Sequence, residues 1–208
     1  MSTTDTRLPL SDVTGPVNDL LTKLAGDDGA DWLKGLKKFL RKENPWKIAK
    51  KVVSKLLEFV SEIEVPGAEK FVTVDNFKKN NSEGVKFWYF GDNFQEHFLK
   101  KVEEGVESTT LKAYRLKEDS LDPPIIAALG DNHETKLLHL WELLKKQPKG
   151  EDGVLLTNGY ANIFYIRAID GTLWAVSADW DGGYGWDVGA HSVEDPNRWN
   201  ADNQVFGC

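Results

Sequence analysis

Two strand-forming runs on either side of Asp170-Gly171 constrain the fold of this chain more than any other feature. Residues 160–168 and 172–180 are rich in aromatic and β-branched side chains, and Asp-Gly is the dipeptide that a type I′ hairpin turn prefers. A two-residue loop predicts an antiparallel pair in which Tyr165 lies opposite Val176. Both faces of this pair are substantially apolar, so we expect packed layers on both sides of the sheet.

The remaining pattern mixes strands with helices. Further strands are expected at 71–77, 85–90, 111–116 and 184–190, the first two paired as a hairpin. Helices are expected at 17–24, 125–129 and 137–144, and also from a capping-box-like Asn93 and Glu96 to Val102. Together these elements predict an α+β fold with a mostly antiparallel sheet and helices packed on it.

Charge is divided unevenly along the chain. Residues 32–57 contain nine basic side chains and one acidic one, Glu43, which gives a local charge of +8. The whole chain carries −7, which leaves −15 for all other residues. Such a division bears on association and steering rather than on a particular fold.

The basic segment also has helical periodicity. Apolar residues from Trp32 to Leu40 keep to one stripe, Asn44-Pro45 is typical of a helix stop and restart, and a second stripe runs from Ala49 to Val60. We therefore expect a loose lead-in at 1–15, a basic amphipathic helical arm at 16–66 and an acidic α+β domain at 70–208. The expected contact surface of the arm comprises Trp32, Leu36, Phe39, Leu40, Trp46, Val53, Leu56 and Leu57.

Three kinds of partner can be considered for a basic amphipathic arm: protein, an anionic membrane and nucleic acid. Docking on protein is favoured, because amphipathic helices usually bury their apolar face in this way. An anionic membrane surface is the alternative, since lysines are attracted to acidic headgroups and tryptophans sit at headgroup depth. Nucleic acid is disfavoured because the acidic domain would repel phosphate. We therefore expect a non-enzymatic interaction module that uses its arm to form a homo-oligomer or to dock on a protein partner.

Two patterns of polar residues resemble metal sites. Asp179, Asp181 and Asp187 have part of the spacing of a calcium loop but lack its glycine and its bidentate glutamate. We interpret them as turn and solvent-facing residues. His133 and His139 lie six positions apart, which places them on different faces of a helix and argues against zinc. No metal or cofactor is expected.

Ser177, Asp179 and His191 could converge at one end of the sheet as a hydrolytic trio. No nucleophile-elbow glycines surround the serine, and a serine in a strand is usually structural. No glycine-rich phosphate loop supports nucleotide chemistry. A hydrolase with its site near these three residues is therefore kept as the second alternative function.

Four tryptophans gather among Asp, Asn and Gly in the last 35 residues. Exposed rings beside short polar side chains can stack on sugars or hold a peptide, whereas buried rings would form a tryptophan-rich core, which we favour. The candidate stacking residues are Trp174, Trp180, Trp186 and Trp199. The exposure of Trp180 and Trp199 distinguishes the two interpretations.

Three runs carry a family resemblance: GEDGVLLTNGYANIFYIR at 150–167, DGTLWAV at 170–176, and a tail with GW, HSVEDP and VF elements. With FWYFGDNF at 87–94, they resemble an uncharacterised bacterial domain that occurs in many related copies in small-genome candidate-phylum bacteria. The resemblance covers about residues 70–208 and implies no activity, ligand or site residue. Many copies with different front ends would suit an adaptor or binding module.

Composition is that of a globular protein. With 40% hydrophobic and 11% aromatic residues, the 208-residue chain can form a proper core. The first ten residues lack the apolar region of a secretory signal, and no run approaches the roughly 18 apolar residues of a membrane span. The single cysteine, Cys208, allows no intramolecular disulfide. A cytoplasmic location is the expectation.

Overall fold

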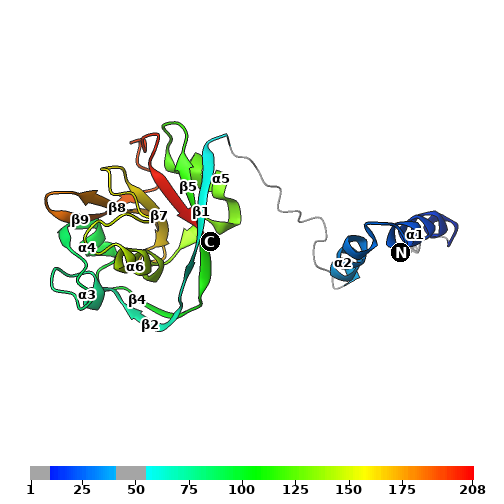
Figure 1. Cartoon of the computed structure of the whole chain (residues 1–208), viewed down its shortest axis with the longest axis horizontal. Helices are drawn as coiled ribbons and strands as arrows, with labels where there is room; N and C mark the ends of the chain where they lie inside the picture. Colours follow the sequence, from blue (N-terminus) through cyan, green and yellow to red (C-terminus); the bar gives the residue numbers. More distant parts are fainter. Residues whose placement is uncertain (1–9, 41–54) are drawn as a thin grey trace, which may run out of the picture. The chain divides into compact units, whose positions relative to one another are not determined.

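The computed structural model describes residues 10–40 and 55–208, which belong to two compact units, Met1–Val52 and Val53–Cys208 (Figure 1). The helices and strands are α1 (Leu10–Leu24), α2 (Gly29–Leu40), β1 (Leu57–Val65), β2 (Ala68–Val72), α3 (Thr73–Asn76), β3 (Phe87–Phe90), α4 (Asp92–His97), β4 (Val102–Val106), β5 (Thr109–Leu116), α5 (Asp122–Leu129), the 3-10 helix η1 (Gly130–Asn132), β6 (Glu134–Thr135), α6 (Leu137–Lys146), β7 (Asn162–Arg167), β8 (Leu173–Asp181), β9 (Gly185–Ser192) and β10 (Gln204–Gly207).

Helices α1 and α2 make up the described part of the first unit, which we call the helical hairpin. A short turn joins them, and it closes where the Gly29 N–H donates to the Gly26 carbonyl at 2.9 Å. Lys23 Nζ lies 4.9 Å from the centroid of the Trp32 ring, a cation–π contact between the two helices. The helix predicted at 17–24 is present and begins earlier, at Leu10.

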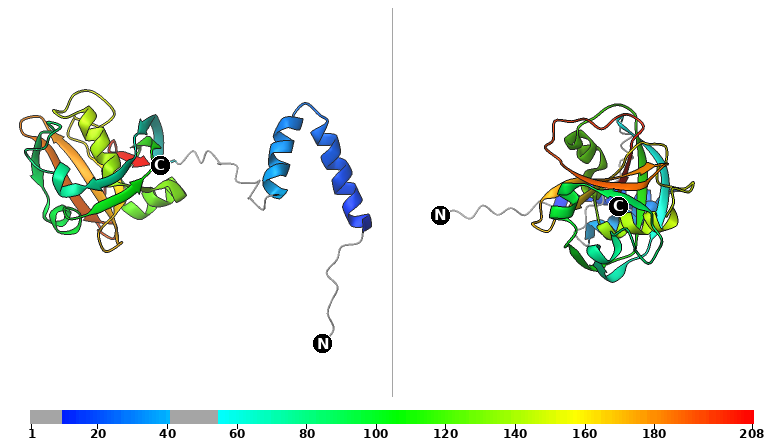
Figure 2. Two further views of the ribbon diagram at one scale, coloured as in Figure 1. Left: turned by 90° about the horizontal axis from the view of Figure 1, so that it is seen from below. Right: turned by 90° about the vertical axis from the view of Figure 1, so that its left-hand side faces the viewer.

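The second unit, which we call the sheet domain, is built on one mixed eight-stranded sheet (Figure 2). The strand order is β1-β5-β10-β7-β8-β9-β3, and β6 also pairs with β7. Four of the strand pairs are antiparallel, and the pairs β10/β7, β3/β9 and β6/β7 are parallel. Strands β2 and β4 form a separate antiparallel pair. The predicted α+β class is confirmed for this domain.

Apolar cores lie on both faces of the sheet, as the two-sided pattern of β7 and β8 predicts. The first face, which carries Phe164 and Val176, packs against α4 and α6. The second face, which carries Ile163 and Ala175, packs against α5 and, near Trp199, against the segment that leads into β10.

The β7–β8 hairpin is present, but its predicted register is wrong by one residue. The Ala168 N–H donates to the Thr172 carbonyl, which closes a loop of three residues ending in Gly171 at φ +86. A left-handed residue in third position is usual for three-residue hairpin loops. Tyr165 therefore pairs with Ala175 rather than with Val176, and a shift of one residue exchanges the face that each partner occupies.

The helical arm predicted at 16–66 ends earlier than expected. Its second helix was expected to run to Val60, but Leu57–Val65 is strand β1, paired with β5 at the edge of the sheet. Leu57, Ile63 and Val65 are buried and Glu64 is exposed, so burial at the end of β1 alternates as in a strand. Pairing with the sheet overrides the helical spacing of the apolar residues. The boundary between the units falls at 52/53 rather than at 66–70. Lys55 and Leu56 form a bend, and the part of that predicted helix before Lys55 lies outside the described residues.

Two smaller predictions are also wrong. Strands β2 and β3 do not form a hairpin: β2 pairs with β4, and β3 pairs in parallel with β9. Between them α3 places Phe77 in a cluster of buried aromatic rings. Helix α4 stops at His97, and Asn93 lies inside it, where its amide donates to the Ala190 carbonyl at 3.1 Å instead of capping the helix. Val102 begins β4.

Candidate functional site

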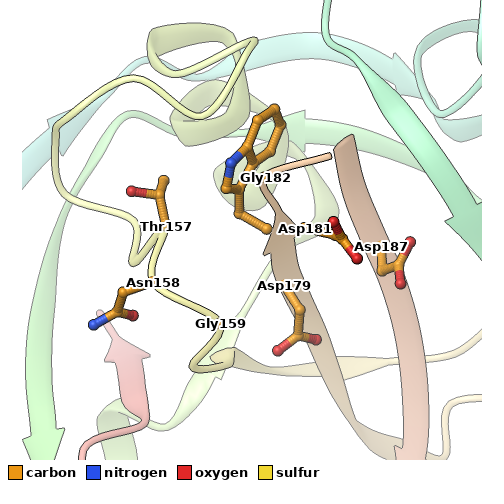
Figure 3. A pocket seen from close by; sticks show the side chains of 8 residues that line it. Thr157, Asn158, Gly159, Asp179, Asp181, Gly182 and Asp187 are labelled. Carbon is orange, nitrogen blue, oxygen red and sulfur yellow. The ribbon is translucent and has the colours of Figure 1, made fainter. Parts of the chain in front are cut away.

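A pocket of about 450 Å³ lies at the polar end of β8 and β9 (Figure 3). Its walls come from the loop before β7, from the end of β8 and the turn after it, and from β9. The lining residues are Thr157, Asn158, Gly159, Asp179, Trp180, Asp181, Gly182 and Asp187. Three carboxyl groups therefore share one pocket, and we call it the acidic pocket.

Two of these acids occupy directly opposed positions on neighbouring strands. Asp179 on β8 pairs directly with Asp187 on β9, so both side chains lie on the second face of the sheet. Burial raises the pKa of Asp179 to about 6; the charge of Asp187 adds to this shift, and a hydrogen bond from the Ser177 hydroxyl opposes it. Burial also raises the pKa of Asp187, helped by the charge of Asp181.

Asp187 has an unused hydrogen-bond acceptor. Its carboxylate accepts the backbone N–H of Tyr89, the β3 residue that pairs with it, but its Oδ1 atom is buried and has no hydrogen-bond partner. The third acid is partly satisfied, because Asp181 Oδ1 accepts the Gly183 N–H at 2.9 Å. Figure 3 shows the carboxyl groups of Asp181 and Asp187 next to each other, on neighbouring strands.

The wall opposite these acids is positioned by a buried amide. Asn162 Nδ2 donates to the carbonyls of Leu156 and Ala178 at 3.0 Å each, and its Oδ1 accepts the Leu156 N–H at 2.8 Å. Asn162 thereby ties the segment just before Thr157 to strand β8. Gly159, at φ +87, then reverses the chain into β7.

Trp180 is held at the pocket by close packing. Its ring meets Trp186 edge-on, with the two ring centroids 5.3 Å apart. Gly150, at φ +71, lies so close to the Trp180 ring that a Cβ at this position would overlap it. Both the backbone conformation and the close approach therefore require glycine.

The four candidate stacking tryptophans have different environments. Trp186 is fully buried, where its Nε1 donates to the Gln147 carbonyl at 3.0 Å, so it has no face open to a ligand. Trp174 stacks on His97 with ring centroids 4.5 Å apart. Trp199 is half-buried, and its Nε1 donates to Asp122 at 2.8 Å. Of the four, Trp180 is the one that lines the acidic pocket.

Ser177, Asp179 and His191 do share the second face of the sheet. The Ser177 hydroxyl is hydrogen bonded to Asp179, and the described hydrogen bonds include none from Ser177 to His191. Gly189 lies between them: a Cβ there would be 3.3 Å from both Ser177 Oγ and His191 Nε2. The His191 ring instead packs edge-on against Trp199 at 5.3 Å. In a hydrolytic triad the histidine lies between the serine and the acid and is hydrogen bonded to both. Here the serine is hydrogen bonded directly to the acid, and the histidine packs against Trp199.

The residues expected to form the contact surface of the arm are divided between the units. Trp32, Leu36, Phe39 and Leu40 belong to α2. Trp46 and Val53 lie outside the described residues. Leu57 is buried in the second-face core and Leu56 is half-buried against it, which corrects their assignment to an arm surface: both belong to the sheet domain.

Sequence reasoning found the acids but not the pocket. Asp179, Asp181 and Asp187 were expected to be turn and solvent-facing residues, and two of them are half-buried in a cavity. Thr157, Asn158 and Gly159 were missed, although Asn-Gly is a turn signal, because their approach to β8 depends on Asn162. Tyr89 was missed because β3 was expected in a hairpin rather than beside β9.

Comparisons with protein-family models, with curated proteins and with solved structures found no match to this chain. The described residues hold no group of three or more His, Cys, Asp or Glu side chains placed to bind a metal ion. Within residues 10–40 and 55–208, no helix is both long and apolar enough to cross a membrane.

Proposed function

We propose that the sheet domain is a non-enzymatic binding module whose acidic pocket accepts a cationic N–H donor from a partner protein, namely the ammonium or guanidinium group of a basic side chain. The observation that carries the proposal is the buried, unpartnered Oδ1 of Asp187 in a pocket shared with Asp179 and Asp181.

Charge supports a cation. Asp179 and Asp187 lie on directly opposed positions, where like charges destabilise a sheet, and the pKa of each is raised. A bound positive charge would lower both pKa values and remove the repulsion. Groups with perturbed pKa values that gather in a cleft are typical of functional sites.

Hydrogen bonding supports an N–H donor in particular. Ionised carboxylates only accept hydrogen bonds, and a buried acceptor without a partner costs about 1–3 kcal/mol. Asp187 lines the pocket, and a rotation of its carboxyl group would bring the buried Oδ1 to the pocket, where an ammonium or guanidinium group would donate to it and to a second carboxylate at once. Such charge-assisted hydrogen bonds are about twice as strong as neutral ones.

Size and surroundings suit a side chain rather than a lone ion. The volume of about 450 Å³ is within the range of small-ligand sites. Tyr89 pairs with Asp187 on the neighbouring strand, and this tyrosine is 51% exposed. Its ring could cover the alkyl stem of a lysine or arginine or lie against the cation itself.

Binding of model cations to the full chain tests this proposal. We would titrate n-butylguanidinium and n-butylammonium while following the backbone amide NMR signals of Gly159, Asp179 and Asp187. The matched control ligand is n-butylurea, which has the shape of the guanidinium compound but no charge. We expect both cations to shift these signals and the urea to leave them unchanged.

Two isosteric variants complete the test. Asp187→Asn should weaken cation binding about tenfold or more, because one charge-assisted hydrogen bond is lost. Glu118→Gln removes an exposed acid outside the pocket and should leave affinity unchanged. Equal binding of n-butylurea, or shifts of the same signals by Ca²⁺ at lower concentration than by either organic cation, would contradict the proposal.

A further inference from the structure

Among the residues of the helical hairpin whose burial is described, five large apolar ones are exposed. Leu40 is 70% exposed and Leu21 is 57% exposed, and Val17, Trp32 and Leu33 are exposed as well. Val17 and Leu21 lie one turn apart on α1, and Leu33 and Leu40 lie two turns apart on α2, so each helix presents a continuous apolar stripe. This surface is separate from the acidic pocket and from the function proposed for it.

Two helices of this length do not form a stable unit alone. α1 has 15 residues and α2 has 12, a length at which isolated helices are marginal in water. Among the hairpin residues whose burial is described, only Gly29 is buried, and a Cβ there would overlap the Leu24 carbonyl. The turn is therefore tight, but the apolar side chains with described burial form no buried core, and units this small usually need oligomerisation or another support.

The charges of the two helices are complementary. Residues 10–28, which are α1 and the turn, carry four aspartates and one lysine, a charge of −3. α2 carries Asp31 and three lysines, a charge of +2. A two-fold pairing can place α1 of each copy against α2 of the other, and in this arrangement both contacts join opposite charges. A second copy of the same hairpin thus matches both the apolar stripes and the charges.

We infer that two copies of this chain associate through their helical hairpins, which pack into a four-helix bundle. The apolar stripes of α1 and α2 form the core of this bundle, and the lysines of one copy face the aspartates of the other. In such bundles the buried positions repeat every three or four residues along each helix, as Val17 and Leu21 do.

The test is the oligomeric state of the full chain, measured by size exclusion with light scattering and by sedimentation. We expect a dimer at about 10–100 μM, a range set by typical weak to moderate association. Leu21→Asp should raise the dissociation constant at least tenfold. Thr22→Asp is the matched control: it adds the same charge to the adjacent, exposed position outside the stripe and should leave the dimer intact.

A charge exchange tests the pairing of α1 with α2. Lys34→Glu with Lys37→Glu should weaken the dimer, and so should Asp19→Lys with Asp27→Lys. An equimolar mixture of the two variants should associate again, since every contact in the mixed dimer joins opposite charges. A monomeric wild-type chain, equal effects of Leu21→Asp and Thr22→Asp, or a mixture that stays monomeric would each overturn the inference. None of these outcomes depends on the acidic pocket.

Discussion

Asp179 and Asp187 lie directly opposite each other on the antiparallel strands β8 and β9. The pKa of each is raised, chiefly by burial, so both are costly to ionise where they stand. The Ser177 hydroxyl and the Tyr89 N–H each donate to one of them, yet Asp187 Oδ1 is left without a partner. Functional sites often retain groups that lower the stability of the fold, and this buried acid pair in a pocket fits that pattern.

Asp179→Asn should stabilise the protein at neutral pH. The pKa of Asp179 in the folded state is about 6, above its ordinary value of 3.8, so ionisation of this group opposes folding. The wild-type protein therefore loses stability as pH rises from about 4 through 6. We expect the variant to be more stable by on the order of 1–2 kcal/mol at pH 7.5. Thermal unfolding at several pH values measures this.

The same comparison carries its own control. Near pH 4 the wild-type carboxyl group is protonated in the folded protein, so the advantage of Asp179→Asn should vanish there. An advantage that is constant across pH would show that the charge of Asp179 is not its cause.

Gly150→Ala should displace Trp180. The added Cβ overlaps the indole ring, and φ +71 is unfavourable for alanine. Gly84→Ala is the matched control, because Gly84 has φ +72 and open space around it. We expect the control to cost about 1 kcal/mol and Gly150→Ala to cost about 2 kcal/mol more. Urea unfolding gives the two costs, and equal values would mean that Trp180 does not pack on Gly150 as described.

Asn162→Leu should loosen the wall of the acidic pocket. It removes the hydrogen bonds of the Asn162 amide to Leu156 and Ala178 and leaves the part-buried Leu156 N–H without its acceptor. We expect a loss of about 2–4 kcal/mol in the free energy of unfolding, together with faster amide hydrogen exchange at 156–159. Asn158→Leu, at an exposed position in the same loop, should change stability by less than about 0.5 kcal/mol. Unchanged exchange rates in Asn162→Leu would contradict this role.

Tyr165→Phe should destabilise the protein by removing a hydrogen bond to Asp122, the buried acid at the start of α5. The Tyr165 hydroxyl donates to Asp122 at 2.7 Å, and burial already raises the pKa of Asp122. Loss of this donor raises that pKa further, so the variant should be destabilised by about 1–3 kcal/mol at pH 7 and by less at pH 4, where Asp122 approaches protonation. Tyr184→Phe, at an exposed tyrosine, should be neutral at both pH values. A penalty independent of pH would contradict the assignment to Asp122.

Local sequence patterns predicted which segments of the sheet domain form helices and strands better than they predicted which strands pair with each other. The β7–β8 hairpin follows from two runs of strand-forming residues around Asp170-Gly171, but its register depends on whether Ile169 belongs to the loop, which the dipeptide alone does not decide. β10 pairs between β5 and β7, in the middle of the sheet, and its four residues carry no signal of that long-range position. β1 has helical spacing that pairing with β5 overrides.

The acidic pocket also depends on long-range contacts that local sequence patterns do not reveal. Asp179 and Asp181 belong to one strand and their spacing is visible in the sequence, but Asp187 becomes their neighbour only through the β8–β9 pairing. Asn162 determines where the opposite wall lies through contacts with a different strand, β8. Side-chain burial, which raises the pKa of Asp179, arises only from these tertiary contacts.

The most direct test of the acidic pocket as a cation site is the pKa of the Asp179 carboxyl group, measured by carbon-detected NMR on the full chain with and without saturating n-butylguanidinium. We predict a value near 6 in the free protein and a decrease of at least about one unit with the cation, while n-butylurea leaves it unchanged. The same pKa with and without the cation would contradict the account.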